Sequence, residues 1–374
     1  MTASMNIGRV WGIPIGIHWS LLVVFALLTS SLATNYFPST YPDLTGAAAW
    51  VSGAVTAILF FGSILLHELG HTWVALRNKV PVKNITLFFL GGVAQIGEPA
   101  KTAGVEFRIA AGGPVVSLML AIGFGLLWFI DRGISFLGAP SGYLALTNLA
   151  LLGFNLLPGY PLDGGRMLRA AVWHFSGSEK QALRVATISG QVLSFALMGI
   201  GAFLILGGNF FNGLYFIVIG WFIQSMVIAE QASSTVQGHL GGVLVGEAMA
   251  VFEEPEVPSR LKLRQVIDDF ILPTGARSFL VVDGDLPRGI VDLRDIAKIP
   301  RERWDWVSVA EVMTPWARLE RVTASTDLLA ALKLMDDKKV GQLPVVETDD
   351  GRPIGLLTRE EIIHVLRVRS ELGV

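Results

Sequence analysis

Six long apolar segments constrain the fold of this 374-residue chain more than any other feature of its sequence. Each is long enough to cross about 30 Å of hydrocarbon, which takes roughly 20 helical residues. Only 16% of the residues are charged, against about 25% in an ordinary soluble domain. The sequence therefore predicts a multi-pass α-helical membrane domain of about six transmembrane helices over residues 1–230. The predicted helices lie near 14–34, 48–76, 103–130, 141–158, 184–207 and 209–230.

The distribution of lysine and arginine predicts the orientation of these helices. Two loops, between segments two and three and between segments four and five, hold most of the basic residues of this half. By the positive-inside rule both loops are cytoplasmic, and six crossings then leave both ends of the membrane domain in the cytoplasm. The basic residues are Arg77, Lys79, Lys83, Lys101, Arg108, Arg166, Arg169, Lys180 and Arg184.

Residues 244–374 are charged throughout and contain an approximate internal repeat. Val245–Met249 aligns with Val309–Met313, and Phe279–Asp283 aligns with Leu343–Glu347, both at an offset of 64 residues. Each copy is expected to contain a helix, two strands and a second helix. We predict a Gly-rich polar linker followed by a soluble α/β module of two repeats. The predicted bounds are 231–243 for the linker and about 244–300 and 308–374 for the repeats.

The second apolar segment contains the motif H-E-x-x-H, formed by His67, Glu68 and His71. On a helix the two histidines lie on one face about 6 Å apart along the axis, so that both can reach one Zn²⁺. Glu68 is next to the first ligand and can act as a general base in hydrolysis. Three ionisable groups in five residues of an apolar helix each cost roughly 2.5–3.5 kcal/mol on insertion, so a compensating metal is expected.

A catalytic zinc needs a third protein ligand, and Asp163 is the best candidate. It follows Pro158 and Pro161 and precedes Gly164-Gly165, which break the helix and allow unusual backbone angles. Irregular backbone at membrane depth is tolerated only inside protein or beside water. An ordinary Asp-Gly turn at the membrane surface is the competing interpretation of the segment taken alone.

The pairing of His67-Glu-Leu-Gly-His71 with the segment from Asn155 to Arg166 resembles the site-2 protease family of intramembrane metalloproteases. The resemblance extends over residues 8–230. It implies one Zn²⁺ bound by His67, His71 and Asp163, Glu68 as general base, and regulated intramembrane proteolysis of single-span, membrane-tethered regulatory proteins. The family often has Asn three residues after its Gly-Pro motif, where this chain has Ser117. Asn148 and Asn155 are alternatives for the role of that Asn.

The segment from Asn84 to Gln95 follows the zinc helix, is rich in β-formers and is interrupted by Gly91-Gly92. We expect a membrane-associated hairpin here. A helical substrate must unwind before its scissile amide is accessible, and a hairpin of this kind can pair with the extended strand that results. A purely structural loop is the alternative.

The repeat in the second half resembles a tandem pair of CBS domains. Many such pairs bind ATP or AMP through a Thr/Ser-x-x-Asp motif, so the resemblance implies a nucleotide site involving Asp295, Thr358 and Glu361. Neither copy of the motif is intact, since Asp292 replaces the hydroxyl in the first copy and Glu361 replaces the Asp in the second. A module without ligand is therefore an alternative, and a homodimer formed through the CBS domains is a further expectation.

Two other functions are compatible with a membrane domain of this kind. A CBS-regulated ion transporter or channel would use the same histidines to bind a transported ion, and an inactive scaffold would bind membrane proteins without cleaving them. The net charge of −2 and the lack of any nucleic-acid motif argue against a nucleic-acid partner. No cysteine is present, which excludes disulfides and Cys-ligated metal.

Overall fold

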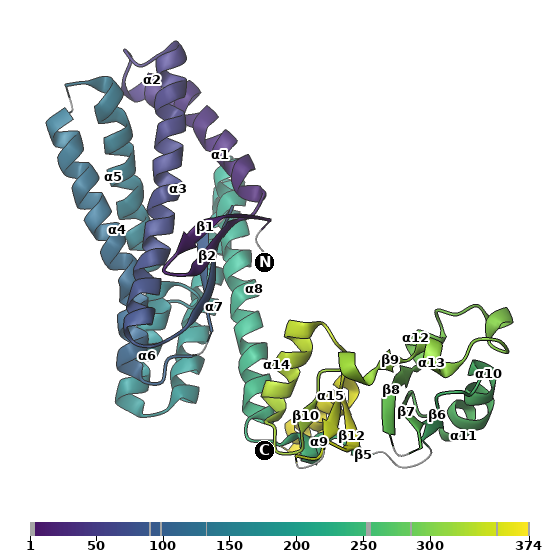
Figure 1. Ribbon diagram of the computed structural model, residues 1–374. Coiled ribbons are helices and arrows are strands. Elements are labelled where there is room, and N and C mark those ends of the chain that lie inside the picture. Colours follow the sequence, from purple (N-terminus) through teal and green to yellow (C-terminus); the bar gives the residue numbers. More distant parts are fainter. Residues whose placement is uncertain are drawn as a thin grey trace. The chain divides into compact units, whose positions relative to one another are not determined.

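The computed structural model describes residues 4–89, 91–97, 99–131, 133–251, 256–284, 286–348 and 351–372. The chain forms two compact units, Met1–Gln231 and Ala232–Val374. Figure 1 labels the helices and strands of both units.

The first unit is built from long apolar helices. Six helical segments of the described residues are long and apolar enough to cross a membrane, as the sequence predicts. These segments are Ser20–Thr40, Gly46–Arg77, Ala103–Ile130, Ser135–Asn155, Glu179–Leu206 and Phe210–Leu240. The elements of the unit are β1 (Met5–Val10), β2 (Ile13–Ile17), α1 (Ser20–Ser31), η1 (Leu32–Tyr36), α2 (Phe37–Thr40), α3 (Gly46–Arg77), β3 (Val82–Phe88), β4 (Gly91–Ile96), α4 (Ala103–Asp131), α5 (Ser135–Asn155), α6 (Asp163–Ser176), α7 (Glu179–Leu206) and α8 (Phe210–Leu240).

The bounds of two predicted helices were wrong at their ends. The first was expected from residue 14, but Ile13–Ile17 is strand β2, because alternating isoleucines pair in parallel with β3 through Ile15 and Ile85. The last was expected to end at residue 230, yet α8 continues to Leu240 through most of the predicted linker. Leu240 is fully buried in the core of the second unit, and this burial stabilises a polar stretch as helix.

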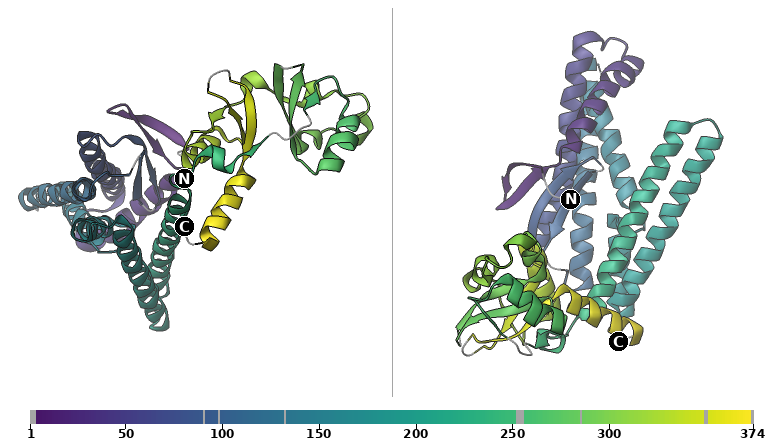
Figure 2. Two further views of the ribbon diagram at one scale, coloured as in Figure 1. Left: turned by 90° about the horizontal axis from the view of Figure 1, so that it is seen from below. Right: turned by 90° about the vertical axis from the view of Figure 1, so that its right-hand side faces the viewer.

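A four-stranded sheet of order β1-β2-β3-β4 accompanies the helices, with β1 and β4 at its edges. The expected hairpin forms between β3 and β4, which pair in antiparallel register from Phe88↔Gly91 to Val82↔Ile96. Both strands contact α3, and the two further views in Figure 2 also have the sheet beside this helix. The sheet thus lies beside the helix that carries the H-E-x-x-H motif.

The second unit contains two small sheets of order β10-β11-β12-β5 and β6-β7-β8-β9. Each copy of the repeat has a helical segment between its first helix and its long strands that the sequence pattern did not predict. The elements of the unit are α9 (Val245–Ala248), β5 (Ala250–Val251), β6 (Val257–Pro258), α10 (Leu263–Val266), η2 (Ile267–Ile271), α11 (Leu272–Thr274), β7 (Ser278–Asp283), β8 (Leu286–Asp292), α12 (Leu293–Ile296), η3 (Arg301–Arg303), α13 (Val309–Val312), β9 (Thr314–Pro315), η4 (Trp316–Arg318), β10 (Val322–Thr323), α14 (Leu328–Lys338), β11 (Gln342–Val346), β12 (Pro353–Thr358) and α15 (Arg359–Leu372).

The two repeats exchange their first helices. Val245 of α9 is buried among the core residues of the second repeat, and Val309 of α13 is buried in the core of the first. Backbone hydrogen bonds show the same exchange: Val245 N–H donates to the Thr326 carbonyl oxygen, and Val309 N–H donates to the Leu261 carbonyl oxygen. The predicted bounds of about 244–300 and 308–374 therefore describe the sequence repeats, whereas each hydrophobic core combines both.

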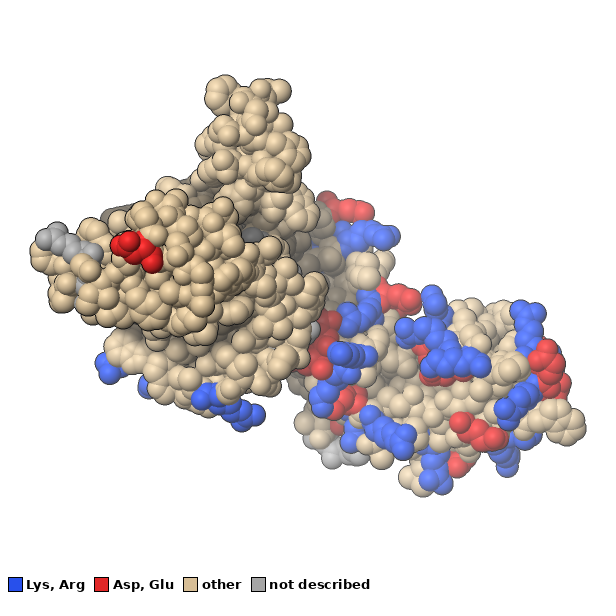
Figure 3. Space-filling model, turned by 90° about the horizontal axis from the view of Figure 1, so that it is seen from above, with Lys and Arg blue, Asp and Glu red and all other residues tan. Residues whose placement is uncertain are grey.

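Charged side chains are distributed unequally between the two units. Figure 3 shows Lys, Arg, Asp and Glu spread densely over the visible face of the second unit, whereas the visible end of the first unit is mostly free of them apart from an acidic group and the basic groups at its lower edge. Few ionised groups are expected on a surface that meets lipid, because an ionised group in hydrocarbon has no water to solvate it.

Candidate metal centre

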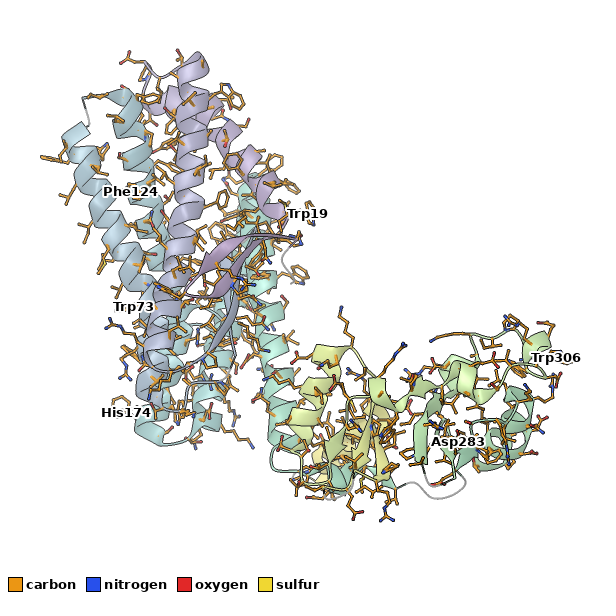
Figure 4. The ribbon with its side chains drawn as sticks, in the orientation of Figure 1. Trp19, Trp73, Phe124, His174, Asp283 and Trp306 are labelled. Carbon is orange, nitrogen blue, oxygen red and sulfur yellow. The ribbon has the colours of Figure 1, made fainter. Side chains whose placement is uncertain are left out.

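The motif H-E-x-x-H lies in the C-terminal half of α3, an uninterrupted helix of 32 residues. His67 and His71 are one turn apart and both are buried, with 4% and 7% of their surfaces exposed. In Figure 4 the labelled Trp73, two residues beyond His71, marks the level of the motif, lower on the molecule than Phe124 of α4. The helix places both imidazoles on the face that packs against α4, where they also meet Asp163, the first residue of α6.

Asp163 is the first residue of α6 and completes a cluster with the two histidines. Its Oδ2 lies 3.1 Å from His67 Nε2, its Oδ1 lies 3.2 Å from His71 Nε2, and the two Nε2 atoms are 3.2 Å apart. Three ligands at about 2.05 Å from a tetrahedral zinc are about 3.3 Å from one another. The three groups thus fit a zinc ion with a fourth position left for water or substrate. Among the described residues this is the only such cluster of His, Asp or Glu.

The loop before α6 brings Asp163 to this place. A Cβ atom on Gly164 would lie 2.3 Å from the Leu156 carbonyl oxygen, and one on Gly165 would lie 2.3 Å from the Gly159 carbonyl carbon. Neither position has room for a larger residue. The two glycines therefore let the start of α6 pack directly on the loop. The expectation that they break the helix and adopt unusual backbone angles was wrong, since both lie in the first turn of α6 and neither has a positive φ.

Helix α4 forms the floor of the site through a close contact between glycines. A Cβ on Gly70 would lie 2.6 Å from the Gly112 carbonyl oxygen, so the two helices approach until their backbones touch. A Cβ on Gly113 would lie 2.2 Å from His71 Nε2 and 2.5 Å from His67 Nε2. The absence of a side chain at Gly113 thus keeps open the space between the metal-facing nitrogens.

Glu68 lies on the side of the site that faces the sheet. A Cβ on Gly92 of β4 would be 2.5 Å from Glu68 Cγ and 3.0 Å from Oε1. The edge strand therefore runs past the residue that the sequence predicts as general base.

Several residues around the site were missed or left in doubt by the sequence. Ser117 replaces the expected Asn, and its Oγ lies 2.8 Å from His67 Nδ1. The His71 Nδ1–H group donates to the Ile109 carbonyl oxygen at 2.7 Å. Asn148 donates to Ser63 Oγ and to the Leu144 carbonyl. Ile109, Gly113 and Ser117 are spaced by four residues and so lie on one face of a helix. This spacing is the sequence signal that could have identified Ile109 and Ser117 as the partners of the two histidines.

A buried ion-pair network lies beside α6 and had no sequence signal. Glu106 of α4 is 3% exposed and pairs at 3.2 Å with Arg169 of α6, which also pairs with Glu179 of α7. The network links three helices around the element that begins with Asp163.

In the second unit, two of the three predicted nucleotide residues line one cavity. Thr358 and Glu361 are hydrogen-bonded to each other and line a cavity of about 330 Å³ between the two repeats. Asp295 is not among the lining residues and pairs with Lys298 instead. Asp292 lines the cavity in its place, so the first copy of the motif contributes the residue at its hydroxyl position. The lining residues are Ala250, Ala276, Arg277, Ser278, Asp292, Arg294, Gly341, Gln342, Leu356, Thr358, Arg359, Glu360 and Glu361.

Asp292 is held in its ionised form by its neighbours in this cavity. Burial by itself raises the pKa of Asp292, but hydrogen bonds from Arg294 and from Ser278 outweigh burial and bring the pKa below its usual range. Ser278 Oγ also lies 3.0 Å from the side-chain amide of Gln342 of the other repeat. The cavity is thus lined by a polar network that spans both repeats.

Comparison with known proteins identifies the family of both units. Residues 55–133 and 135–200 match peptidase family M50, and residues 309–368 match the CBS domain. The zinc metalloprotease sll0528 of Synechocystis sp. is 32% identical over 376 aligned positions, covering 99% of this chain and 97% of the relative. The zinc metalloprotease Rip3 of Mycobacterium tuberculosis is 32% identical over 372 positions, covering 98% and 94%. Among solved structures, the site-2 protease from Methanocaldococcus jannaschii is 29% identical with a TM-score of 0.43, covering 60% of this chain and 94% of that one.

The two curated relatives match nearly the whole chain, and the matches agree with its two units: within the described residues, one has six potential membrane helices and the other has small sheets. The chain therefore belongs to peptidase family M50: it is a membrane-embedded zinc metalloprotease of the site-2 protease type that carries a CBS module in its C-terminal half.

Proposed function

We propose that His67, His71 and Asp163 bind one catalytic Zn²⁺, that Glu68 is the general base, and that the enzyme cleaves transmembrane segments of single-span, membrane-tethered regulatory proteins. The observation that carries this proposal is the convergence of three buried side chains from α3 and α6 within 3.1–3.2 Å of one another. Without an ion, these three buried groups would have only one another as partners, and the two Nε2 atoms would face each other at 3.2 Å.

The residues around the zinc position divide the chemistry among them. A bound zinc ion supplies Lewis acidity and makes water more acidic. Glu68 accepts the proton from the attacking water and returns it to the leaving amine. The Asn148 side-chain NH₂ group already donates to Ser63 Oγ and to the Leu144 carbonyl oxygen. Asn155, at the end of α5, is therefore the better of the two side-chain amides for donating a hydrogen bond to the substrate carbonyl oxygen.

The edge strand β4 is the proposed docking place for the unwound substrate. It is at the free edge of the sheet and contacts Glu68 through Gly92. Edge strands present unpaired backbone groups that an extended peptide can pair with. A substrate strand added there would pass directly beside Glu68 and bring its scissile amide toward the metal centre.

Cleavage in proteoliposomes tests this function and separates it from its alternatives. With a single-span substrate, Glu68→Gln is expected to lower the cleavage rate by about 10²–10⁴-fold, because the proton acceptor is lost, while zinc is retained. Asp43→Asn, in the exposed turn before α3, is the control and should cleave normally. Ion flux without cleavage would support a transporter, and substrate binding without cleavage or flux would support a scaffold.

We further propose that the CBS module senses an adenine nucleotide in the cavity lined by Thr358 and Glu361. Its volume of about 330 Å³ is at the lower end of the range of ligand sites. Millimolar ATP or AMP is expected to raise the melting temperature, because a ligand that binds only the folded state stabilises it. Thr358→Ala should reduce this shift, whereas Thr274→Ala, outside the cavity, should not. No shift in the wild-type protein would favour a structural or dimerising module.

The orientation and the oligomeric state are part of the same proposal. The basic loops support an orientation in which the N-terminus and the CBS module are cytoplasmic. The enzyme is proposed to lie in the cell membrane and to form a homodimer through its CBS domains. The cysteine-free chain allows a direct test of orientation with single substitutions. In intact cells an impermeant thiol reagent should label Ser39→Cys, before α3, and should not label Ser176→Cys, at the end of α6. The opposite labelling would invert the topology, and cross-linking of the CBS module would report the dimer.

A further inference from the structure

The two histidines of the metal centre are oriented by partners of different kinds, both on α4. His71 Nδ1 is bound by the backbone carbonyl oxygen of Ile109 at 2.7 Å, whereas His67 Nδ1 meets the side-chain hydroxyl of Ser117 at 2.8 Å. A carbonyl oxygen can only accept, so it requires the proton on Nδ1 and leaves Nε2 free as a ligand. The orientation of His71 is therefore built into the backbone, while that of His67 depends on one side chain.

Ser117 is placed for this contact by the same helix packing that opens the site. Ile109, Gly113 and Ser117 are spaced by four residues and share one face of α4. The Gly70–Gly112 contact presses this face against α3. Ser117 is fully buried, so its hydroxyl is shielded from water that could replace the histidine as its partner.

We infer that Ser117 is a positioning residue for zinc binding: its hydroxyl accepts a hydrogen bond from His67 Nδ1–H and so keeps Nε2 directed at the metal. The inference rests on the proposed ligand set of His67, His71 and Asp163. A hydroxyl can donate or accept, and it adopts the accepting role here because Nε2 must present its lone pair to the ion. Ser117 itself touches neither the metal nor the substrate.

Loss of the Ser117 hydroxyl is expected to lower the affinity for zinc, and to affect catalysis only through zinc binding. Without Ser117 the His67 ring can rotate or exchange tautomers, and part of the population then has no lone pair at the metal position. Loss of such a supporting hydrogen bond typically weakens metal binding by about 10–100-fold. The neutral hydroxyl also leaves the ligand less basic than a carboxylate partner would, because a carboxylate would draw the Nδ1 proton more strongly.

Zinc affinity of the full-length protein in detergent, measured by competition with a chelator, tests the inference. Ser117→Ala is expected to weaken zinc binding by about 10–100-fold. Ser194→Ala is the matched control, since Ser194 is equally buried on α7 and bonds to Gln224, away from the metal centre. It should lose a comparable buried hydrogen bond and keep wild-type zinc affinity.

A spectroscopic readout separates positioning from general destabilisation. In protein loaded with Co²⁺, the visible absorption bands should shift in Ser117→Ala and remain unchanged in Ser194→Ala. Ser117→Cys, which keeps nearly the same volume but bonds weakly, should also lose zinc affinity and serves if the alanine variant does not fold.

Failure of the Ser117 inference can be distinguished from failure of the proposed function. If the wild-type protein binds zinc tightly and Ser117→Ala or Ser117→Cys binds it equally well with unchanged cobalt bands, Ser117 has no positioning role and the proposed function survives. If the wild-type protein binds no zinc, both proposals fail together.

Discussion

The two units of this protein use ionisable side chains in opposite ways. In the membrane unit four ionisable groups of α3, α4 and α6 are buried, and they face partners, as Glu106 faces Arg169 and Asp163 faces His67 and His71. In the C-terminal unit most ion pairs are exposed, such as Arg264 with Asp305. A buried charge costs several kcal/mol unless it is paired, whereas an exposed pair contributes about 0–1 kcal/mol. The position of a polar group is therefore informative about function in the first unit and much less so in the second.

The sharpest test of this contrast adds a single methyl group to the membrane unit. Gly113→Ala should abolish zinc binding and proteolysis, because its Cβ would lie within 2.2–2.5 Å of the metal-facing nitrogens. Gly123→Ala on the same helix has open space and should behave as the wild type. Zinc content after dialysis and cleavage of a reconstituted substrate measure both variants. A Gly113→Ala protein with full zinc content would refute the geometry of the site.

Breaking the buried ion pair should have the next largest effect. Arg169→Met leaves Glu106 buried without its partner and is expected to lower the free energy of unfolding by about 3–5 kcal/mol. Thermal melting in detergent measures the loss of stability, and recovery of activity after cooling checks that unfolding is reversible. The double variant Arg169→Met/Glu106→Gln should regain much of the stability, since no uncompensated charge remains. Equal stability of the wild type and the single variant would place the pair in contact with water.

The pH dependence of the C-terminal unit provides a smaller effect with a defined sign. Because the folded pKa of Asp292 lies below its usual value of 3.8, the ionised group contributes stability above that value. The contribution is lost as the pH falls through the lower, folded pKa. The melting temperature of Asp292→Asn should therefore be below that of the wild type at pH 6, and the difference should shrink below pH 4. A difference that does not depend on pH would mean that packing, not charge, is responsible.

The smallest effect is expected for an exposed pair. Arg264→Ala removes the partner of Asp305, with both side chains about half exposed, and should change the free energy of unfolding by at most about 1 kcal/mol. Added salt should reduce even this difference, because exposed charges are screened. A loss of stability as large as that of Arg169→Met would contradict the difference between buried ion pairs in the first unit and exposed ion pairs in the second.

Local patterns accounted for much of the architecture. The six apolar helices were predicted from hydropathy, and the two families from the resemblance of the metal-site motifs and of the internal repeat to known proteins; all were confirmed. The β-strand at Ile13–Ile17 was missed, because an apolar run is compatible with either a helix or a strand until its pairing partner is known. The exchange of α9 and α13 between the repeats was also missed, because a sequence repeat does not say which copy buries which helix.

The order of residues along the chain already specified the chemistry available to this protein: two histidines one helical turn apart, a glutamate between them, and an aspartate that follows two prolines. Such relations depend on neighbours along the chain, which propensity and periodicity describe. Only the tertiary structure decided that the Asp163 carboxylate meets both imidazoles, that Gly113 leaves room between them and that Ser117 supports His67. These relations join residues 42–96 positions apart, and only the packing of α3, α4 and α6 brings such residues into contact.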